Sequence, residues 1–161
     1  MAGTKLQVRD PSTAERRKVT LQARSSEMVA SPGGPGDPSA GGAVLELYNP
    51  GTGEIAGLDL PASNWRVRGS GSGTTIYKYA GRTGPCRTAT LAVGRLTASC
   101  KGSDIGFTLD EATQGNLAVR LTTGTGVPVH YCMVFGGTVQ TDAPGDFTAV
   151  AAPAPASCPI P

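Results

Sequence analysis

The amino-acid sequence predicts an all-β protein, an antiparallel β-sandwich of about ten to twelve short strands. The chain contains 23 glycines and 13 prolines among its 161 residues, so turns are frequent. Between the turns, runs rich in Thr, Val and Leu alternate apolar and polar residues, which is typical of half-buried strands. Two of the four cysteines lie on either side of a predicted hairpin turn. These observations leave an Ig-like and a jelly-roll-like topology both open.

The clearest single element is a hairpin closed by two cysteines. Two runs of Thr, Ala, Leu and Val meet at the turn Val93-Gly94, and Cys86 and Cys100 lie at nearly equal distances from it. A tight turn places these cysteines within a residue or two of directly opposite each other, where a modest bulge brings them into bonding range. We therefore expect a Cys86–Cys100 disulfide.

The other two cysteines complete a two-disulfide framework. Four cysteines allow three pairings, and the hairpin leaves Cys132 to pair with Cys158. This bond would tie a Pro/Ala-rich tail, residues 151–161, to a strand. The chain has no CxxC motif and no cysteine–histidine cluster, which argues against zinc and for an oxidising compartment.

The remaining strands follow from alternation and turn signals, taken in chain order. Residues 5–9 and 18–24 each place apolar side chains on one face. A turn cluster at 49–53 separates two further runs, which predicts another hairpin. The run 127–135 is polar at neither of its two edges, which predicts a strand in the interior of a sheet. The other predicted strands are 61–68, 74–79, 104–109, 116–121, and an edge strand from 138–141 and 147–150.

The chain length suits one domain, residues 1–161. Residues 30–42 form a Gly/Pro-rich segment with little apolar surface, and we expect a flexible loop there, with a second flexible connection at 69–73. No apolar stretch is long enough to span a membrane. The formal net charge of +2, spread along the chain, argues against a nucleic-acid partner.

Groups that could perform catalysis or bind metal are few. His130 is the only histidine, so any histidine-based nucleophilic triad must use it, and we expect a packed or half-buried side chain beside the disulfide of Cys132. The acids could be paired for glycoside hydrolysis, but their spacing selects no pair, so we expect no enzymatic activity and no cofactor. A structural Ca²⁺ is the one metal we consider, although no spacing matches a dedicated calcium loop. Its candidate ligands are Asp104, Asp110, Glu111, Asp142 and Asp146.

The aromatic residues predict a more specific site. Tyr77 and Tyr79 lie two residues apart on one strand face, and Trp65 lies in the neighbouring segment beside Asn64 and Arg66. Flat rings next to amide and guanidinium donors suit sugar rings, which stack through C–H groups and hydrogen-bond through hydroxyls. The alternative is that these rings pack in the core of a protein that has only eight aromatic residues.

Residues 37–161 carry a series of segments that resemble a known module. They are 42–50 (GAVLELYNP), 60–65 (LPASNW), 77–79 (YKY), 84–86 (GPC), 100–110 (CKGSDIGFTLD), 115–121 (GNLAVRL) and 131–137 (YCMVFGG). Together they resemble an uncharacterised β-rich module that recurs in secreted proteins of deltaproteobacteria. The resemblance implies an exported accessory module and assigns no ligand or catalytic residue to this chain.

The sequence therefore predicts a secreted, non-catalytic accessory module, either released from a signal peptide or cut from a longer chain. Its first predicted role is binding a polysaccharide or cell-surface glycan through Trp65, Tyr77, Tyr79, Asn64 and Arg66. The alternative role is a structural or adhesive spacer, or a protein–protein interaction module, in a larger extracellular protein. The oligomeric state is left open by the sequence.

Overall fold

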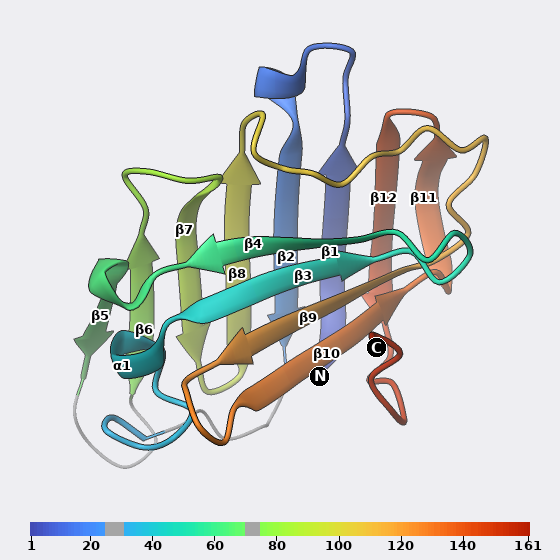
Figure 1. The fold of residues 1–161 in the computed structure, drawn as a ribbon. Helices are drawn as coiled ribbons and strands as arrows, with labels where there is room; N and C mark the ends of the chain where they lie inside the picture. The colour runs from blue at the N-terminus through green and yellow to red at the C-terminus, as the bar shows by residue number, and fades with distance from the viewer. Residues whose placement is uncertain (25–30, 70–74) are drawn as a thin grey trace.

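The computed structural model describes residues 1–24, 31–69 and 75–161 and shows an antiparallel two-sheet sandwich, which confirms the predicted fold class (Figure 1). The larger sheet contains, in spatial order, β11 (Thr138–Ala143), β12 (Asp146–Ala152), β1 (Ala2–Arg9), β2 (Lys18–Arg24), β8 (Arg95–Lys101), β7 (Cys86–Ala92), β6 (Ile76–Ala80) and β5 (Trp65–Arg68). The smaller sheet contains β10 (Val129–Phe135), β9 (Leu117–Thr123), β3 (Ala43–Tyr48) and β4 (Ile55–Leu60). Three short helical turns complete the described elements: η1 (Ala14–Arg16), α1 (Pro38–Gly41) and η2 (Ala62–Asn64).

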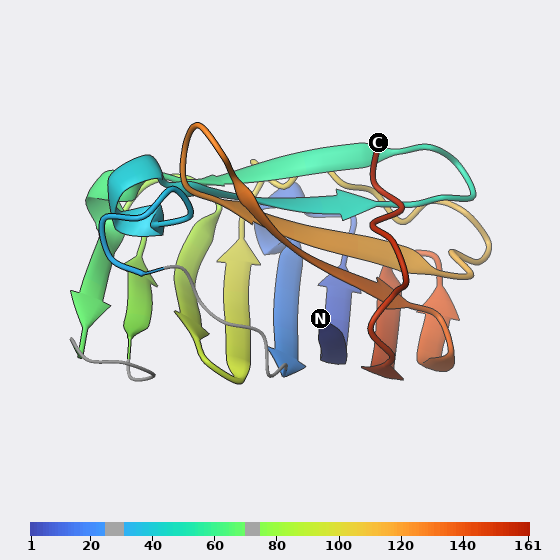
Figure 2. The same cartoon turned by 90° about the horizontal axis from the view of Figure 1, so that it is seen from below.

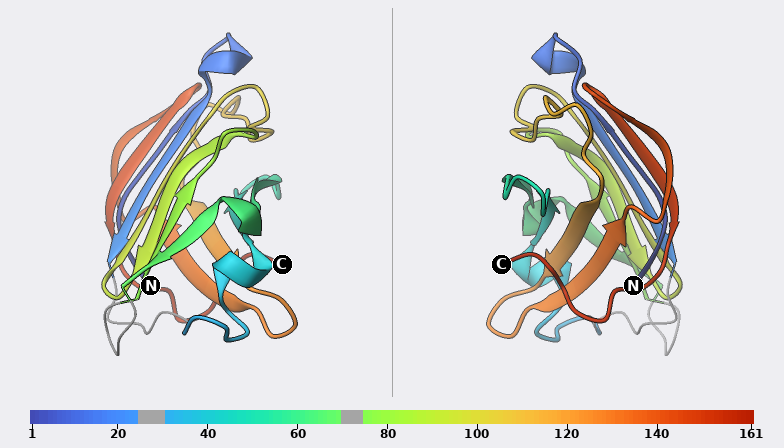
Figure 3. Two further views of the ribbon diagram at one scale, coloured as in Figure 1. Left: turned by 90° about the vertical axis from the view of Figure 1, so that its left-hand side faces the viewer. Right: turned by 90° about the vertical axis from the view of Figure 1, so that its right-hand side faces the viewer.

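The two sheets face each other with their strands running in different directions. Seen from below and from the sides, they form two separate layers, and the strands of the smaller sheet cross those of the larger one (Figures 2 and 3). Alternate side chains of each sheet point into the space between the layers. Leu21 of β2 and Leu45 of β3, for example, are both fully buried. The period-two pattern in the sequence thus marks the core-facing side of each strand.

The predicted hairpin and its disulfide are confirmed. Cys86 of β7 and Cys100 of β8 are directly paired, and the register shifts by one residue between Cys86 and Thr88, which is the expected bulge. Gly94 in the turn has a φ of 75°, a left-handed conformation that favours glycine. Both cysteines are fully buried, so this disulfide joins two central strands inside the core.

The segment 104–109 is not a strand, although its inward face is as predicted. It belongs to a long connection from β8 to β9 that runs across one end of the larger sheet (Figure 1). Ile105, Phe107 and Leu109 are buried between the layers. The Leu109 amide donates to the Asp10 carboxylate at 3.0 Å, so a side chain replaces a neighbouring strand as its partner. Alternation alone cannot distinguish these two cases.

The run over 127–135 was predicted as a central strand, but β10 is an edge of the smaller sheet. The strand is unusually apolar for an edge strand because β1 and β12 of the larger sheet pack against it. The Met1 amine donates to the Cys132 carbonyl at 3.0 Å. At the end of the chain, β11 is the predicted edge strand, whereas β12 is interior, between β11 and β1.

The described part of the Gly/Pro-rich segment 30–42 has a defined conformation. Asp37 is 3% exposed and caps α1 by accepting from the Ser39 amide at 2.7 Å and from the Gly33 amide at 2.7 Å. Burial raises the pKa of the Asp37 carboxyl, but these hydrogen bonds outweigh it and the net pKa is lowered. Ala30 and most of the connection 69–73 lie outside the described residues.

Candidate functional site

The aromatic residues of the predicted glycan site lie inside the protein. Trp65, Tyr77 and Tyr79 are 1%, 0% and 3% exposed, respectively. They come from β5 and β6 at one end of the larger sheet and point toward the smaller sheet. Of the two interpretations that the sequence left open, the burial agrees with core packing and not with an exposed aromatic face, because the sandwich uses its few large rings to fill the core.

The rings contact each other and the chain around them. The Trp65 and Tyr79 ring centroids are 5.3 Å apart with planes tilted by 59°. The Trp65 indole Nε1 donates to the Leu60 carbonyl at 3.1 Å. This bond holds the ring against the end of β4 in the smaller sheet. Burial, followed by the nearby charge of Asp37 and the Tyr131 phenol, raises the pKa of Tyr77 to about 12.

The two polar residues of the predicted site lie nearer the surface and bond locally. The half-buried Asn64 amide donates to the Tyr79 hydroxyl at 3.5 Å. The exposed Arg66 guanidinium donates to the carbonyls of Ser63 and Trp65 at 2.8 and 2.7 Å. Asn64 and Arg66 are therefore close to the rings as predicted, but the rings beside them offer no surface to a ligand.

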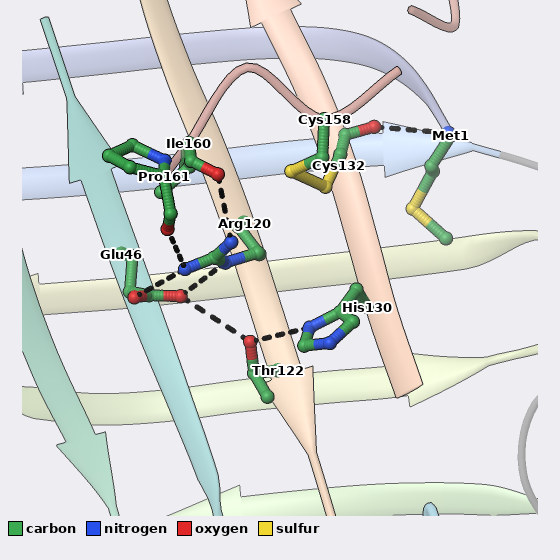
Figure 4. Close-up of a disulfide and its surroundings, with 9 residues drawn as sticks. All are labelled: Met1, Glu46, Arg120, Thr122, His130, Cys132, Cys158, Ile160 and Pro161. Atoms are coloured by element: carbon green, nitrogen blue, oxygen red, sulfur yellow. Dashed lines mark hydrogen bonds and ion pairs between the residues drawn. A yellow bond between two sulfur atoms is a disulfide. The ribbon is translucent and has the colours of Figure 1, made fainter. Parts of the chain in front are cut away.

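A polar cluster that sequence reasoning did not assemble lies on the outer face of the smaller sheet. The strand register aligns Cys132, Arg120 and Glu46 in one row across β10, β9 and β3. The next row aligns His130 with Thr122. Glu46 and His130 are far apart in the sequence, and only the strand order β10-β9-β3 brings them together on this face (Figure 4).

An ion pair forms the centre of this outer cluster. The Arg120 Nε and Nη2 atoms lie 2.6 and 2.9 Å from the two Glu46 carboxylate oxygens. Both side chains are less than one-fifth exposed. The Arg120 hydrogen bonds, which outweigh the effect of burial, hold the pKa of the Glu46 carboxyl below its usual value, and Glu46 in turn raises the pKa of Arg120.

The C-terminal tail lies over this ion pair. The predicted Cys132–Cys158 disulfide is present and holds the tail against β10. Arg120 also donates to the Ile160 carbonyl at 3.1 Å and to Pro161 O at 3.3 Å (Figure 4). Ile160 is 5% exposed although both of its neighbours are exposed. One guanidinium thus joins the sheet to the tail.

The chain was compared with protein-family models, with curated proteins and with solved structures. No match was found in any of the three comparisons. Function must therefore be argued from the geometry of the chain itself.

The outer cluster has the residue types of a nucleophilic site but not its arrangement. The Thr122 hydroxyl lies 3.4 Å from the Glu46 carboxylate and 3.0 Å from His130 Nδ1. A general base works best with a pKa near the working pH, whereas Arg120 keeps the Glu46 carboxylate ionised and weakly basic. His130 is exposed on the edge strand β10, which corrects the expectation of a packed or half-buried histidine, because its side chain lies on the outer face of that strand. It lines neither of the two cavities described below, although its partner Thr122 lines one of them. The cluster is arranged as rows of charged and polar side chains across the outer face of the sheet.

The structure brings no calcium site together from the candidate acids that it describes. Asp142 accepts from the Gln114 and Gly115 amides at 2.6 and 2.9 Å. Glu54, an acid outside the calcium candidates, accepts in a similar way from the Thr108 amide at 2.9 Å and from the Thr108 hydroxyl at 3.0 Å. Within residues 1–24, 31–69 and 75–161, no group of three or more His, Cys, Asp or Glu side chains could hold a metal ion.

Together with Asp10, these acids hold the long β8–β9 connection in place. Asp10 near the end of β1, Glu54 before β4 and Asp142 on β11 each accept backbone amides from it. Asp10 and Glu54 therefore replace part of the ladder that a strand at 104–109 would have supplied, and Asp142 holds the later part of the connection. The sequence signal that could have revealed them is weak, because each is an acid beside a turn.

Two shallow cavities lie beside the smaller sheet. One of about 280 Å³ opens between α1, η2 and the strands, and its polar groups are those of Asp59 and Thr122. A second of about 280 Å³ lies between Asp59 and Asp104. Both are open and hold few convergent polar groups, unlike a typical ligand pocket.

In the described ranges, no helix is long and apolar enough to cross a membrane.

Proposed function

We propose that the chain is a non-catalytic structural module of an extracellular protein, a rigid spacer rather than a glycan-binding unit. The burial of Trp65, Tyr77 and Tyr79 carries this proposal, because the rings that a sugar would stack on are committed to the core.

The covalent framework supports the same role. All four cysteines are in disulfides, which persist in oxidising compartments outside the cytosol. One disulfide lies inside the larger sheet and the other fixes the tail to the smaller sheet, so each layer has its own covalent tie. The resemblance to a module of secreted proteins agrees with this location.

Iodide quenching of tryptophan fluorescence tests the proposal directly, because Trp65 is the only tryptophan. We expect weak quenching of the folded chain and strong quenching in denaturant. The same preparation is then incubated with insoluble cellulose, xylan and chitin, and we expect no retention on any of them.

Glycan binding stays a prediction that rests on Asn64 and Arg66 alone. Retention on a polysaccharide that is lost in Asn64→Ala and Arg66→Ala but kept in Arg68→Ala would overturn the spacer proposal. Arg68 is the matched control, since it is an exposed arginine on the same strand, β5. Strong quenching of Trp65 in the folded chain would contradict its burial.

A further inference from the structure

The C-terminal tail is held to the sandwich at its far end only. Between the end of β12 at Ala152 and Cys158, the tail residues are exposed, apart from a half-buried Pro155. No backbone-to-backbone hydrogen bond joins residues 153–161 to the described part of the chain. The attachment consists of the Cys132–Cys158 disulfide, the two Arg120 hydrogen bonds and the buried Ile160 side chain.

The two disulfides differ in access to solvent. Cys158 is exposed and Cys132 is half-buried, whereas Cys86 and Cys100 are both 0% exposed. Thiol–disulfide exchange requires a thiolate to reach a sulfur atom. The tail disulfide is therefore open to exchange in the folded protein, and the core disulfide is not.

The backbone is strained at the second-last residue of β12, just before the tail begins. Ala151 has a φ of 52° and is the one non-glycine residue with positive φ in the described ranges. An L-residue is disfavoured in this left-handed region. Strain in a hinge segment favours exchange of the element beyond it between two copies of a chain.

We propose that the tail is exchangeable between two copies of this chain, with Cys158 of one copy bonded to Cys132 of the other and Ile160 docked beside the second copy's Arg120. The docked contacts are the same within one copy and between two, so exchange needs no new complementary surface. A second copy is the fitting occupant because the outer face already binds this tail sequence. The proposal goes beyond the spacer role and does not depend on it.

The exchange is redox-neutral and needs a small-molecule thiol such as glutathione. Its thiolate attacks one sulfur of Cys132–Cys158, forms a mixed disulfide with that cysteine and releases the other as a thiolate. The released thiolate of one copy attacks the mixed disulfide of a second copy, which forms the intermolecular bond and returns the small-molecule thiolate. The short tail favours its own copy at low protein concentration, so the exchanged form grows with concentration.

Isotope mixing tests the proposal on the unaltered chain. Light and ¹⁵N-labelled copies are folded separately, mixed at about 1 mM in a glutathione redox buffer, and the products are quenched by acid and alkylation. The dimer fraction from size exclusion is digested without reduction and analysed by mass spectrometry. We expect peptides that link a heavy Cys132 to a light Cys158, while Cys86–Cys100 peptides stay unmixed.

The core disulfide is an internal control for unfolding. Mixed Cys132–Cys158 peptides should exceed mixed Cys86–Cys100 peptides by about tenfold or more, given the difference in thiol access. The absence of mixed tail peptides, or equal mixing at both disulfides, overturns the proposal. The first result means that the tail stays with its own copy, and the second means that mixing occurred through unfolded chains.

Two hinge variants test the part played by strain. Ala151→Gly permits the positive φ without strain and should lower the mixed tail peptides by about fivefold. Ala156→Gly, in the exposed part of the tail, adds the same flexibility without relieving strain and should leave the yield unchanged. Equal yields from both variants would remove Ala151 from the proposal.

Discussion

Glu46 and Arg120 lie directly opposite each other on the neighbouring strands β3 and β9 and form a two-pronged ion pair on the outer face of the smaller sheet. The same guanidinium reaches the backbone of Ile160 and Pro161, so the ion pair lies between the sheet and the tail. Replacing Glu46 would leave a largely buried arginine with backbone carbonyls as its remaining partners.

We expect Glu46→Gln to lower the free energy of unfolding by about 2 kcal/mol at pH 7. The pKa of Glu46 is lower in the folded chain than its ordinary value of 4.5, so its stabilisation is complete above that pH and is lost as the pH falls below it. The difference between the parent chain and Glu46→Gln should therefore shrink below pH 4.5, as measured by urea unfolding at several pH values. A difference that stays constant down to pH 3 would contradict this assignment. Asp59→Asn, an exposed acid on β4, is the matched control.

The difference in burial between the two disulfides predicts stepwise reduction. Under native conditions, dithiothreitol should reduce Cys132–Cys158 first, because the thiolate can reach Cys158, whereas Cys86–Cys100 should persist until the chain unfolds. Timed alkylation followed by mass spectrometry measures the order. Simultaneous loss of both disulfides without denaturant would show that the core opens as readily as the tail.

The sequence predicts much of the fold because alternation, turn residues and the spacing of the hairpin cysteines are all local patterns. Alternation assigns the side chains of each strand to two opposite faces, and the spacing of Cys86 and Cys100 around Val93-Gly94 places them close to opposite each other, as the structure has them. The errors have one kind of cause, which is packing between segments distant in the sequence. The segment 104–109 buries three apolar residues without a strand partner, because acids elsewhere accept its amides.

In the candidate site, too, local patterns are predicted correctly and contacts between distant segments are not. Tyr77 and Tyr79 share a face as predicted, but alternation does not say whether that face meets solvent or the other sheet. The Glu46–Arg120 pair was beyond sequence reasoning because it depends on β9 lying between β3 and β10. Residues 61–116 separate the β3–β4 hairpin of this sheet from its β9–β10 pair along the chain, and no local signal specifies that the two pairs join.

The carboxylate of Asp142 should stabilise the end of the β8–β9 connection. Because it accepts two backbone amides, from Gln114 and Gly115, Asp142→Ala should lower the free energy of unfolding by about 2 kcal/mol. Asp142→Asn retains one acceptor oxygen and should cost less. The comparison is made by urea unfolding, with Asp110→Ala as the control, since Asp110 is an exposed acid of the same connection. Equal losses in Asp142→Ala and Asp110→Ala would mean that the two amide bonds contribute little.

The buried phenol of Tyr77 should make the protein sensitive to alkaline pH. Burial raises the pKa of Tyr77 to about 12 in the folded chain, from an ordinary value of 10.0. Below pH 10 the phenol is protonated in both states and its contribution is intact. Between pH 10 and about 12 the unfolded chain releases the proton first, so the free energy of unfolding falls as the pH rises.

Tyr77→Phe removes this ionisable group from the core and should make the fall in stability between pH 10 and 12 shallower by up to one proton in the pH slope. Removing a fully buried hydroxyl also changes the free energy of unfolding at neutral pH, so the slope rather than the absolute value is the readout. Guanidinium unfolding at intervals from pH 8 to pH 12 measures it. Tyr48→Phe, on the half-buried outer face of β3, is the matched control for the loss of a tyrosine hydroxyl. An unchanged slope in Tyr77→Phe would mean that the Tyr77 phenol ionises as easily in the folded chain as in the unfolded one.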